Sequence, residues 1–214
     1  MKIIFLFIVN IWLFCFANIT VAAVPTANSA HEVLTSIGNN LFKRIREKKH
    51  QILNDPQVMS TIVEQELMPY VDHRYVAYKI LGKNLKKMSK EQRTKFVIVI
   101  KKHLTRTYAN VLRQYNNQKV TFEPEKNIQG RKIVSIKANI SNEPKADIII
   151  DFKMRMNKKT KQWKAFDMVV EGISLLSSKQ AEINSRIRSH GIDQVTFDLA
   201  NLNNKQNVKS QTGR

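Results

Sequence analysis

The sequence contains little of the material from which most enzyme active sites are built. Its 214 residues include one cysteine, Cys15, with six glycines and five prolines. A single cysteine excludes an intramolecular disulfide, a redox pair and a zinc site made of several thiolates. The chain has no glycine-rich phosphate loop and no nucleophile elbow. The composition thus gives little support to an enzyme, and a length of 214 residues without internal repeats indicates one domain.

Titratable residues offer few candidates for chemistry. Asp72 and His73 are adjacent and could act as acid and base, but Asp72 is also well placed to cap a helix. Asp167 and Glu171 lie among apolar strand residues, where a perturbed pKa is expected, and a structural pair with an arginine is the simpler role for them. The five histidines stand on separate segments, with no pair three or four residues apart: His31, His50, His73, His103 and His190. We therefore predict no catalytic residue and no metal site.

Residues 1–23 have the pattern of a cleavable signal peptide. Lys2 supplies the positive start, residues 3–17 are almost wholly apolar, and small residues precede an expected cleavage site after Ala23. The alternative is a retained membrane anchor, but the apolar run is shorter than the roughly 20 residues that span a bilayer. Cleavage would also remove Cys15, and an exported protein without thiols suits a bacterial periplasm.

Basic residues outnumber acidic ones. Lys and Arg total 36 and Asp and Glu total 17, for a formal net charge of +19, and cleavage of the signal peptide would remove one positive charge. Such a charge attracts nucleic acid, acidic proteins and anionic membranes, and export argues against nucleic acid. One basic run is either a solvated helix face or a docking surface for acidic headgroups or an acidic protein: Lys43, Arg44, Arg46, Lys48 and Lys49.

The stretch from residue 61 to residue 82 organises the first half of the chain. Its apolar residues have helical spacing up to Pro69, which cannot continue the backbone hydrogen bonds. Asp72 is expected to cap a second helix that Gly82 ends. The stretch contains no catalytic constellation, so we interpret it as an apolar wall.

Helices are also expected on both sides of this stretch. Apolar residues recur every four positions over residues 33–45, which predicts an amphipathic helix. Asp55 and Pro56 are expected to start the next helix. A capping box at residues 89–92 opens the longest helix, which is expected to end near Tyr115.

After Lys119 the apolar period changes from near four to two, which indicates strands. Strands are expected over residues 134–140, 148–156 and about 162–171, with an edge strand over 120–123. Turn residues separate them, so we predict an antiparallel meander.

Helical spacing returns from Ser178, stops at Gly191 and resumes as a short helix over residues 195–202. Residues 203–214 are polar and are expected to be a disordered tail. The order of helices, strands and helices predicts an α+β fold, with helices packed on a twisted, mostly antiparallel sheet of about four strands.

Four segments carry a resemblance to a known family. They are PYVDHRYVAYKILG at 69–82, SKEQRTKFVIVIKKHLTRTYANVLRQY at 89–115, WKAFDMVVEGISLL at 163–176 and RSHGID at 188–193. In their order and spacing they resemble the MlaC family of toluene-tolerance proteins, over about residues 30–202. The resemblance implies that residues 24–202 form an MlaC-like phospholipid-binding domain.

The family's pattern falls on a set of individual positions: Pro69, Asp72, Leu81, Gly82, Glu91, Gln92, Asp167, Glu171, Gly172, Ser174 and Leu175. The sequence departs from the family at Leu85, where many members have tryptophan, and at Lys179 and Gln180, where many have Tyr-Arg. These departures concern the rim of the pocket and contacts to the headgroup.

The resemblance implies a periplasmic phospholipid carrier that is not an enzyme and has no cofactor apart from its lipid cargo. In the family, lipid tails enter a cavity between the sheet and the helices, and the headgroup stays near solvent. The implied partners are an inner-membrane ABC lipid-transport complex with its membrane-attached lipid-binding subunit, and an outer-membrane lipoprotein and porin complex. The carrier is expected to be a monomer and to maintain the lipid asymmetry of the outer membrane.

We expect the lipid contacts to come from the apolar wall, the long helix and the sheet. They are Ile62, Val63, Leu67, Tyr70, Tyr75, Val76, Leu81, Ile100, Leu104, Tyr108, Ile150, Phe152, Met154, Met168 and Val170. Two alternatives stay open: a small periplasmic α+β enzyme or binder that uses Asp167 or His73 on another apolar ligand, and a structural adaptor of the cell envelope with a solid core.

Overall fold

The computed structural model describes residues 29–128 and 130–209, with side chains described as far as Asn203. The predicted signal peptide lies outside the described residues. The helical elements before the sheet are α1 (Ala30–Glu47), α2 (Lys49–Asn54), α3 (Pro56–Ile62), η1 (Val63–Leu67), η2 (Met68–Tyr70), α4 (His73–Leu81), η3 (Gly82–Lys87) and α5 (Lys90–Leu112). The strands and last helix are β1 (Val120–Phe122), β2 (Ile133–Ile140), β3 (Ile148–Met156), β4 (Trp163–Val170), β5 (Ile173–Ser174) and α6 (Leu175–Lys209). This order confirms the α+β fold, with five strands where about four were predicted.

Reciprocal hydrogen bonds set the starts of two helices. Ser89 Oγ accepts from Gln92 N at 3.2 Å and Gln92 Oε1 accepts from Ser89 N at 3.0 Å, which confirms the predicted capping box of α5. Ser29 and Glu32 make the same exchange at the start of α1, at 3.0 Å in both directions. Each box satisfies two amides that have no partner within the helix.

The wall at residues 61–82 has the predicted ends and an unpredicted middle. Asp72 Oδ1 accepts from Tyr75 N at 3.1 Å, so Asp72 caps α4 as expected. Gly82 ends α4 with φ of +52°, a value that L side chains rarely adopt. Between α3 and Asp72, however, the chain forms the π-helical turn η1 and then the 3₁₀ turn η2, which contains Pro69. These turns redirect the chain from α3 into α4.

The sheet is an antiparallel meander in chain order, from β1 to β5. β3 pairs with β2 and β4 along most of its length, with an irregularity in the β4 register between Lys153 and Met154. β4 turns into β5 through Glu171 and Gly172, with φ of +48° and +82°. Positive φ at both central residues is the geometry of a tight two-residue hairpin.

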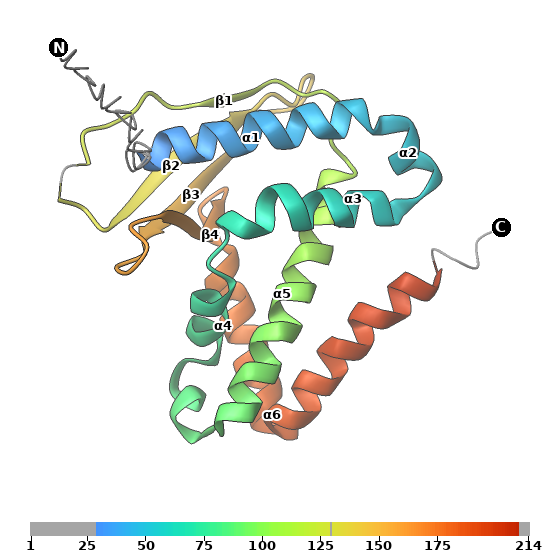
Figure 1. Cartoon of the computed structure of the whole chain (residues 1–214), viewed down its shortest axis with the longest axis vertical. Helices are drawn as coiled ribbons and strands as arrows, with labels where there is room; N and C mark the ends of the chain where they lie inside the picture. Colours follow the sequence, from blue (N-terminus) through green and yellow to red (C-terminus); the bar gives the residue numbers. More distant parts are fainter. Residues whose placement is uncertain (1–28, 129, 210–214) are drawn as a thin grey trace, which may run out of the picture.

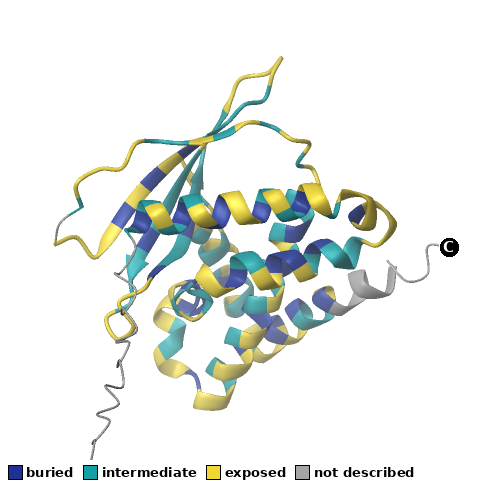
Figure 2. Ribbon diagram, turned by 45° about the horizontal axis from the view of Figure 1, so that its top comes forward, coloured by how far each residue is buried: buried dark blue, intermediate teal, exposed yellow. Residues whose placement is uncertain are grey.

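The helices occupy two regions relative to the sheet. Figure 1 shows α1 lying across the sheet, with α3 beside it and α4, α5 and α6 extending away from β4. Buried and exposed residues alternate along α1 in Figure 2, and the buried Ala30 and Leu34 pack in one cluster with residues of the sheet. No helix of residues 29–128 or 130–209 is both long and apolar enough to cross a membrane.

The last helix differs from its prediction in length. α6 contains the predicted break at Gly191, where φ is +75°, and continues as helix to Lys209. The sequence placed the start of a disordered tail at residue 203. Asn203 is instead buried, and its Nδ2 donates to the Val99 carbonyl of α5 at 3.3 Å. α6 thus still packs on α5 at Asn203, the residue where the tail was predicted to begin.

Candidate functional site

The buried apolar side chains form three clusters. The first lies among α4, α5 and α6, and the second among α1, α2, α3 and α5. The third lies between α1 and the sheet, where Leu34 packs with residues such as Ile136 and Met154. Leu104 of α5 packs against both the first and the second cluster. Helix α5 therefore connects the two helical clusters.

Part of the inner face of the sheet is incompletely covered. Ile150 pairs with Val170 and Phe152 pairs with Met168, and directly paired residues share a face. β3 and β4 are inner strands with a neighbour on each side, yet all four of these side chains are only half-buried. Met154, on the same face, has 0% exposure in the cluster beneath α1. We call the four half-buried residues the sheet patch.

Half-buried apolar side chains also occur on the helical side. They are Leu67 on η1, Tyr75 on α4, and Leu104 and Tyr108 on α5. Burial raises the pKa of Tyr108 to about 12, and the negative charge of Asp167 on β4 contributes to the rise. Tyr108 therefore lies deep in the protein, on the side of α5 that is near β4. Tyr108 also packs against the second cluster, so it belongs to the border of the apolar interior.

The fifteen predicted lipid contacts thus divide into three groups. Eight are half-buried: the sheet patch together with Leu67, Tyr75, Leu104 and Tyr108. Six are sealed within the three clusters: Ile62, Val63, Val76, Leu81, Ile100 and Met154. Tyr70 is 41% exposed. The half-buried group is the one that a ligand could reach with the least rearrangement.

A junction of polar and aromatic groups joins α4 to the sheet. Asp72 N donates to the Ala165 carbonyl of β4 at 2.8 Å, and Arg155 of β3 donates to Asp72 Oδ2 at 2.5 Å. The guanidinium of Arg155 also lies 4.2 Å from the centre of the Tyr75 ring. Tyr75 in turn meets Phe166 edge to face at 5.3 Å. This junction fixes the half-buried Tyr75 between the helical layer and the sheet.

The carboxylates considered as catalytic candidates have structural partners. Asp167 accepts from Ser174 Oγ at 2.7 Å and from Leu176 N at 3.0 Å, so it holds the start of α6. The expected arginine partner is therefore wrong for Asp167, whereas Asp72 does pair with an arginine, Arg155. Glu171 is exposed in the β4–β5 turn and accepts from Ile149 N at 2.8 Å. It therefore stabilises the hairpin.

The histidine candidate, His73, follows Asp72 at the start of α4. Burial lowers the pKa of His73, and the charge of Lys101 adds to the effect, so the neutral imidazole is favoured. Its Nδ1 is buried and makes no hydrogen bond within the described residues. Among residues 29–128 and 130–209, no group of three or more His, Cys, Asp or Glu side chains is arranged to hold a metal ion.

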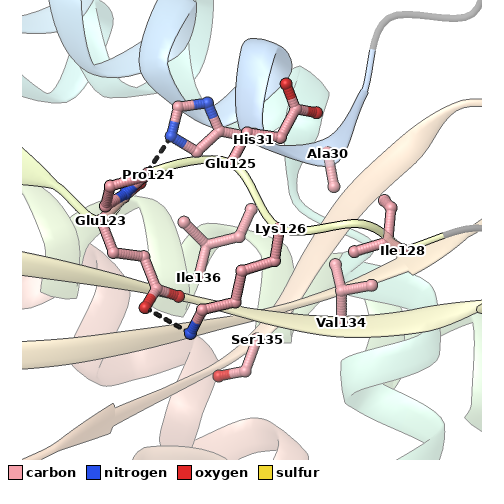
Figure 3. A pocket seen from close by; sticks show the side chains of 10 residues that line it. All are labelled: Ala30, His31, Glu123, Pro124, Glu125, Lys126, Ile128, Val134, Ser135 and Ile136. Atoms are coloured by element: carbon pink, nitrogen blue, oxygen red, sulfur yellow. Dashed lines mark hydrogen bonds and ion pairs between the residues drawn. The ribbon is translucent and has the colours of Figure 1, made fainter.

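The surface of the described residues includes two hollows of very different size. The first, of about 20 Å³, lies between the start of α1 and the segment after β1, where His31 Nε2 is 2.7 Å from the Glu123 carbonyl (Figure 3). This volume holds about one water molecule. The second, of about 320 Å³, lies beside Phe42 of α1 and Tyr115 after α5. None of the fifteen predicted contacts lines either hollow.

The sequence patterns missed several residues of this interior. One of them is Phe42, which packs against the second cluster and whose ring lies 4.5 Å from that of Tyr115, a residue that the helical spacing before residue 115 did include. Phe42 is adjacent to the four-residue repeat of α1 and so carried no periodic signal. Phe166 lies beside the register irregularity of β4. Such an irregularity changes which face of the sheet a side chain is on, so strict alternation predicts the wrong face there. No sequence signal revealed this irregularity.

The departures from the family pattern lie at the other end of the helical region. Leu85 packs against the first cluster. Gln180 Nε2 donates to the Lys79 carbonyl at 2.6 Å, and Lys179 forms an ion pair with Glu182 at 2.6 Å. Gln180 therefore joins α6 to α4, whereas the Lys179 ion pair lies within α6.

Comparison with known proteins agrees with this architecture. The family model described as MlaC protein matches residues 35–201. The intermembrane phospholipid transport system binding protein MlaC of Haemophilus influenzae is 33% identical over 166 residues, which cover 77% of this chain and 78% of that protein. The toluene tolerance protein ttg2D of Pseudomonas putida is 25% identical over 163 residues, covering 73% of this chain and 74% of that protein.

A solved structure has the same fold. It is a phospholipid-binding protein from Ralstonia solanacearum, determined in complex with a phospholipid, and it matches with a TM-score of 0.70 at 19% identity. The match covers 81% of this chain and 99% of that chain. The sequence matches extend over most of the domain, and the resemblance first noted in its segments is thereby confirmed: the chain belongs to the MlaC protein family.

Proposed function

We propose that this protein is a phospholipid carrier of the periplasm that moves lipid between the inner and outer membranes. The observation that carries the proposal is a set of apolar side chains that are only half-buried, the sheet patch on β3 and β4 and the residues Leu67, Tyr75, Leu104 and Tyr108 on the helical side. The names of the relatives from H. influenzae and R. solanacearum, which refer to phospholipid transport and binding, support the choice of ligand.

The free energy of acyl-chain hydration explains why such a surface is useful. Two acyl chains contain roughly 30 methylene groups, and each costs about 0.8 kcal/mol to expose to water. The total, on the order of 25 kcal/mol, prevents free diffusion of the lipid between membranes. A carrier replaces the bilayer by an apolar chamber and needs no catalytic group. The structural use of Asp72, Asp167 and Glu171 agrees with this role.

We infer that the lipid tails lie between the sheet patch and α5. Ile150, Phe152, Met168 and Val170 would contact the tails from one side, and Leu67, Leu104 and Tyr108 from the other. Because these side chains are half-buried rather than exposed, the two layers would separate to admit the tails. The contacts of Asp72, Tyr75 and Arg155 would then hold α4 to the sheet while the layers separate on the other side.

We also propose where the carrier works and which complexes it meets. The predicted signal peptide supports a location in the periplasm. We propose that it receives and delivers lipid at the inner-membrane ABC complex with its lipid-binding subunit and at the outer-membrane lipoprotein and porin complex. The net charge of +19 favours acidic docking surfaces on these partners.

Two adjacent residues of β3 provide a matched test of the chamber. Ile150 belongs to the half-buried sheet patch, whereas Ile149 on the opposite face is 42% exposed. We expect Ile150→Asp to reduce phospholipid uptake from vesicles severalfold, because a carboxylate would be placed against the acyl chains. We expect Ile149→Asp to take up as much lipid as the wild type. Uptake is measured by native mass spectrometry after the vesicles are removed.

Thermal unfolding of both variants controls for a loss of structure. If Ile150→Asp does not fold, Met168→Gln tests the cross-strand neighbour with a smaller perturbation. Equal lipid uptake by the wild type and a folded Ile150→Asp variant would contradict the chamber. A wild-type protein that takes up no lipid would contradict the carrier function itself.

A further inference from the structure

The larger surface hollow has an apolar floor. It lies between the C-terminal half of α1 and the segment that joins α5 to β1, and we call it the α1–β1 hollow. Phe42 and Tyr115 line it with rings 4.5 Å apart, tilted by 32°. Both rings also pack against the second apolar cluster, which includes Leu67, Leu104 and Tyr108 on its border. The floor of the hollow is therefore one edge of the apolar interior.

The rim of the hollow is cationic. Arg46 and Lys119 line it, with the amide side chains of Asn39 and Gln118, and no carboxylate is among the lining residues. Asn39, Phe42 and Arg46 are spaced by three and four residues, so they lie on one face of α1. Gln118 Oε1 accepts from Asn116 N at 2.7 Å, which leaves its NH₂ group as the end that can donate to a ligand.

Two other cations of the basic run on α1 have acidic partners. Arg44 pairs with Glu66, and Lys43 lies 3.9 Å from Glu47. Within the part of the chain whose side chains are described, Arg46 and Lys119 form no ion pair. The basic run of α1 is thus partly neutralised within the protein, and the charge that remains at Arg46 faces the hollow.

Regular structure holds both sides of the hollow. Arg46 belongs to the last turns of α1. The Lys119 carbonyl accepts from Ser141 N at 2.9 Å, and the next residue, Val120, pairs with Ile140 of β2. The backbones that carry the two cations are therefore fixed before any ligand arrives.

We propose that the α1–β1 hollow binds a phosphate group, either that of a phospholipid head or free phosphate. Arginine and lysine form charge-assisted hydrogen bonds with phosphate oxygens, and arginine does so with two parallel donors. The volume of about 320 Å³ suits a headgroup and is at the lower end of the roughly 300–1,000 Å³ of ligand pockets. The apolar floor favours the lipid source, because a headgroup held there would direct its tails toward Leu104 and Tyr108. The lipid source rests on the proposed function.

The test removes both charges and compares two lipids. Arg46→Gln/Lys119→Gln is compared with the wild type and with Lys86→Gln/Lys87→Gln, which removes two exposed charges from η3. Each protein is incubated with vesicles of phosphatidylglycerol and phosphatidylethanolamine that contain an equal amount of dioleoylglycerol, and the bound lipids are counted by mass spectrometry. We expect the wild type and the η3 control to prefer phospholipid. The hollow variant should lose about tenfold or more of that preference, as expected for one charge-assisted hydrogen bond.

A second arm uses inorganic phosphate without lipid. Backbone NMR shifts of residues around Arg46 and Lys119 are followed during a phosphate titration of the wild type and the hollow variant. A response that the variant abolishes, with an unchanged lipid preference, supports a site for free phosphate. Arg46→Lys, which keeps the charge, should retain most of the effect in whichever arm responds.

The outcomes separate this proposal from the carrier function. If the wild type takes up phospholipid and the hollow variant has the same lipid preference and the same phosphate response, the hollow proposal is overturned and the carrier function stands. If no protein takes up lipid, the carrier function fails, and the phosphate arm alone decides the hollow.

Discussion

Replacing Asp72 by asparagine would test the junction between α4 and the sheet. Asp72 has two roles: it caps α4 through Tyr75 N, and it forms an ion pair with Arg155 of β3. Asparagine caps helices about as well as aspartate, so Asp72→Asn removes the ion pair and keeps the cap. Asp72→Ala removes both. The two variants therefore separate the contributions of the helix cap and of the contact between layers.

The structure sets the expected magnitudes. The Asp72 and Arg155 side chains are 14% and 24% exposed, so the pair is only partly screened by water. A hydrogen bond to a charged group contributes about 1.5–3 kcal/mol when buried, and partial exposure reduces this to about 1–2 kcal/mol. Loss of a cap costs about 1 kcal/mol. We expect the free energy of unfolding to fall by about 1–2 kcal/mol in Asp72→Asn and about 2–3 kcal/mol in Asp72→Ala.

Urea unfolding of a double-mutant cycle with Arg155→Met measures the pair directly. We expect a coupling energy of about 1 kcal/mol or more, because either single change breaks the same contact. Weakening the junction should also speed lipid exchange between protein and vesicles. A coupling energy near zero, or equal losses in Asp72→Asn and Asp72→Ala, would refute the reasoning.

Three further changes test other parts of the structure. Ser89→Ala should lower the free energy of unfolding by about 1 kcal/mol through loss of the α5 capping box, whereas Ser185→Ala on an exposed turn of α6 should change it little; equal effects in urea unfolding would contradict the cap. Gly82→Ala should cost about 1–2 kcal/mol, because φ is +52° there and a Cβ would lie 3.1 Å from Gln180 Nε2; an unchanged thermal midpoint would count against this geometry. Burial, followed by the charges of Lys179 and Arg106, lowers the pKa of His103 from 6.5 to about 4, so its contribution to stability is present above pH 6.5 and is lost as the pH falls toward 4. His103→Gln should therefore reduce the loss of stability between pH 6.5 and pH 4, and a pH profile identical to that of the wild type would argue against it.

Local signals predicted the ends of elements well. The capping box at Ser89, the cap at Asp72 and the end of α4 at Gly82 depend on residues within a few positions of one another. Strand phase was equally local: Ile150 and Phe152 alternate along β3, and the register places Val170 and Met168 beside them. The alternation within each strand was therefore available from the sequence, and the pairing of β3 with β4 came from the structure.

Contacts between residues far apart in the chain could not be predicted from the sequence. Asp72 and Arg155 are 83 residues apart, and neither has a sequence context that identifies the other. The π-helical turn η1 and the irregularity in β4 depend on how neighbouring layers pack, and periodicity assumes that both are absent. The continuation of α6 past residue 203 was also not predictable from local signals. Asn203 is polar, and its side chain donates to a carbonyl of α5, 104 residues earlier in the chain.

The separation of core from candidate site also required the structure. Val76, Ile100 and Met154 have the same apolar character as Leu104 and Ile150, and periodicity places all of them inside. Only the structure reveals that Val76, Ile100 and Met154 are fully buried, whereas Leu104 and Ile150 are half-buried.

The central claim is that acyl chains lie between the sheet patch and α5. The most direct measurement is paramagnetic broadening of methyl NMR signals by a phospholipid that carries a nitroxide on one acyl chain. We predict strong broadening at Ile150, Val170 and Leu104, and little at the exposed Ile133 and Ile149, which are 56% and 42% exposed. Broadening of Ile133 and Ile149 with sharp signals from Ile150 and Leu104 would contradict the account.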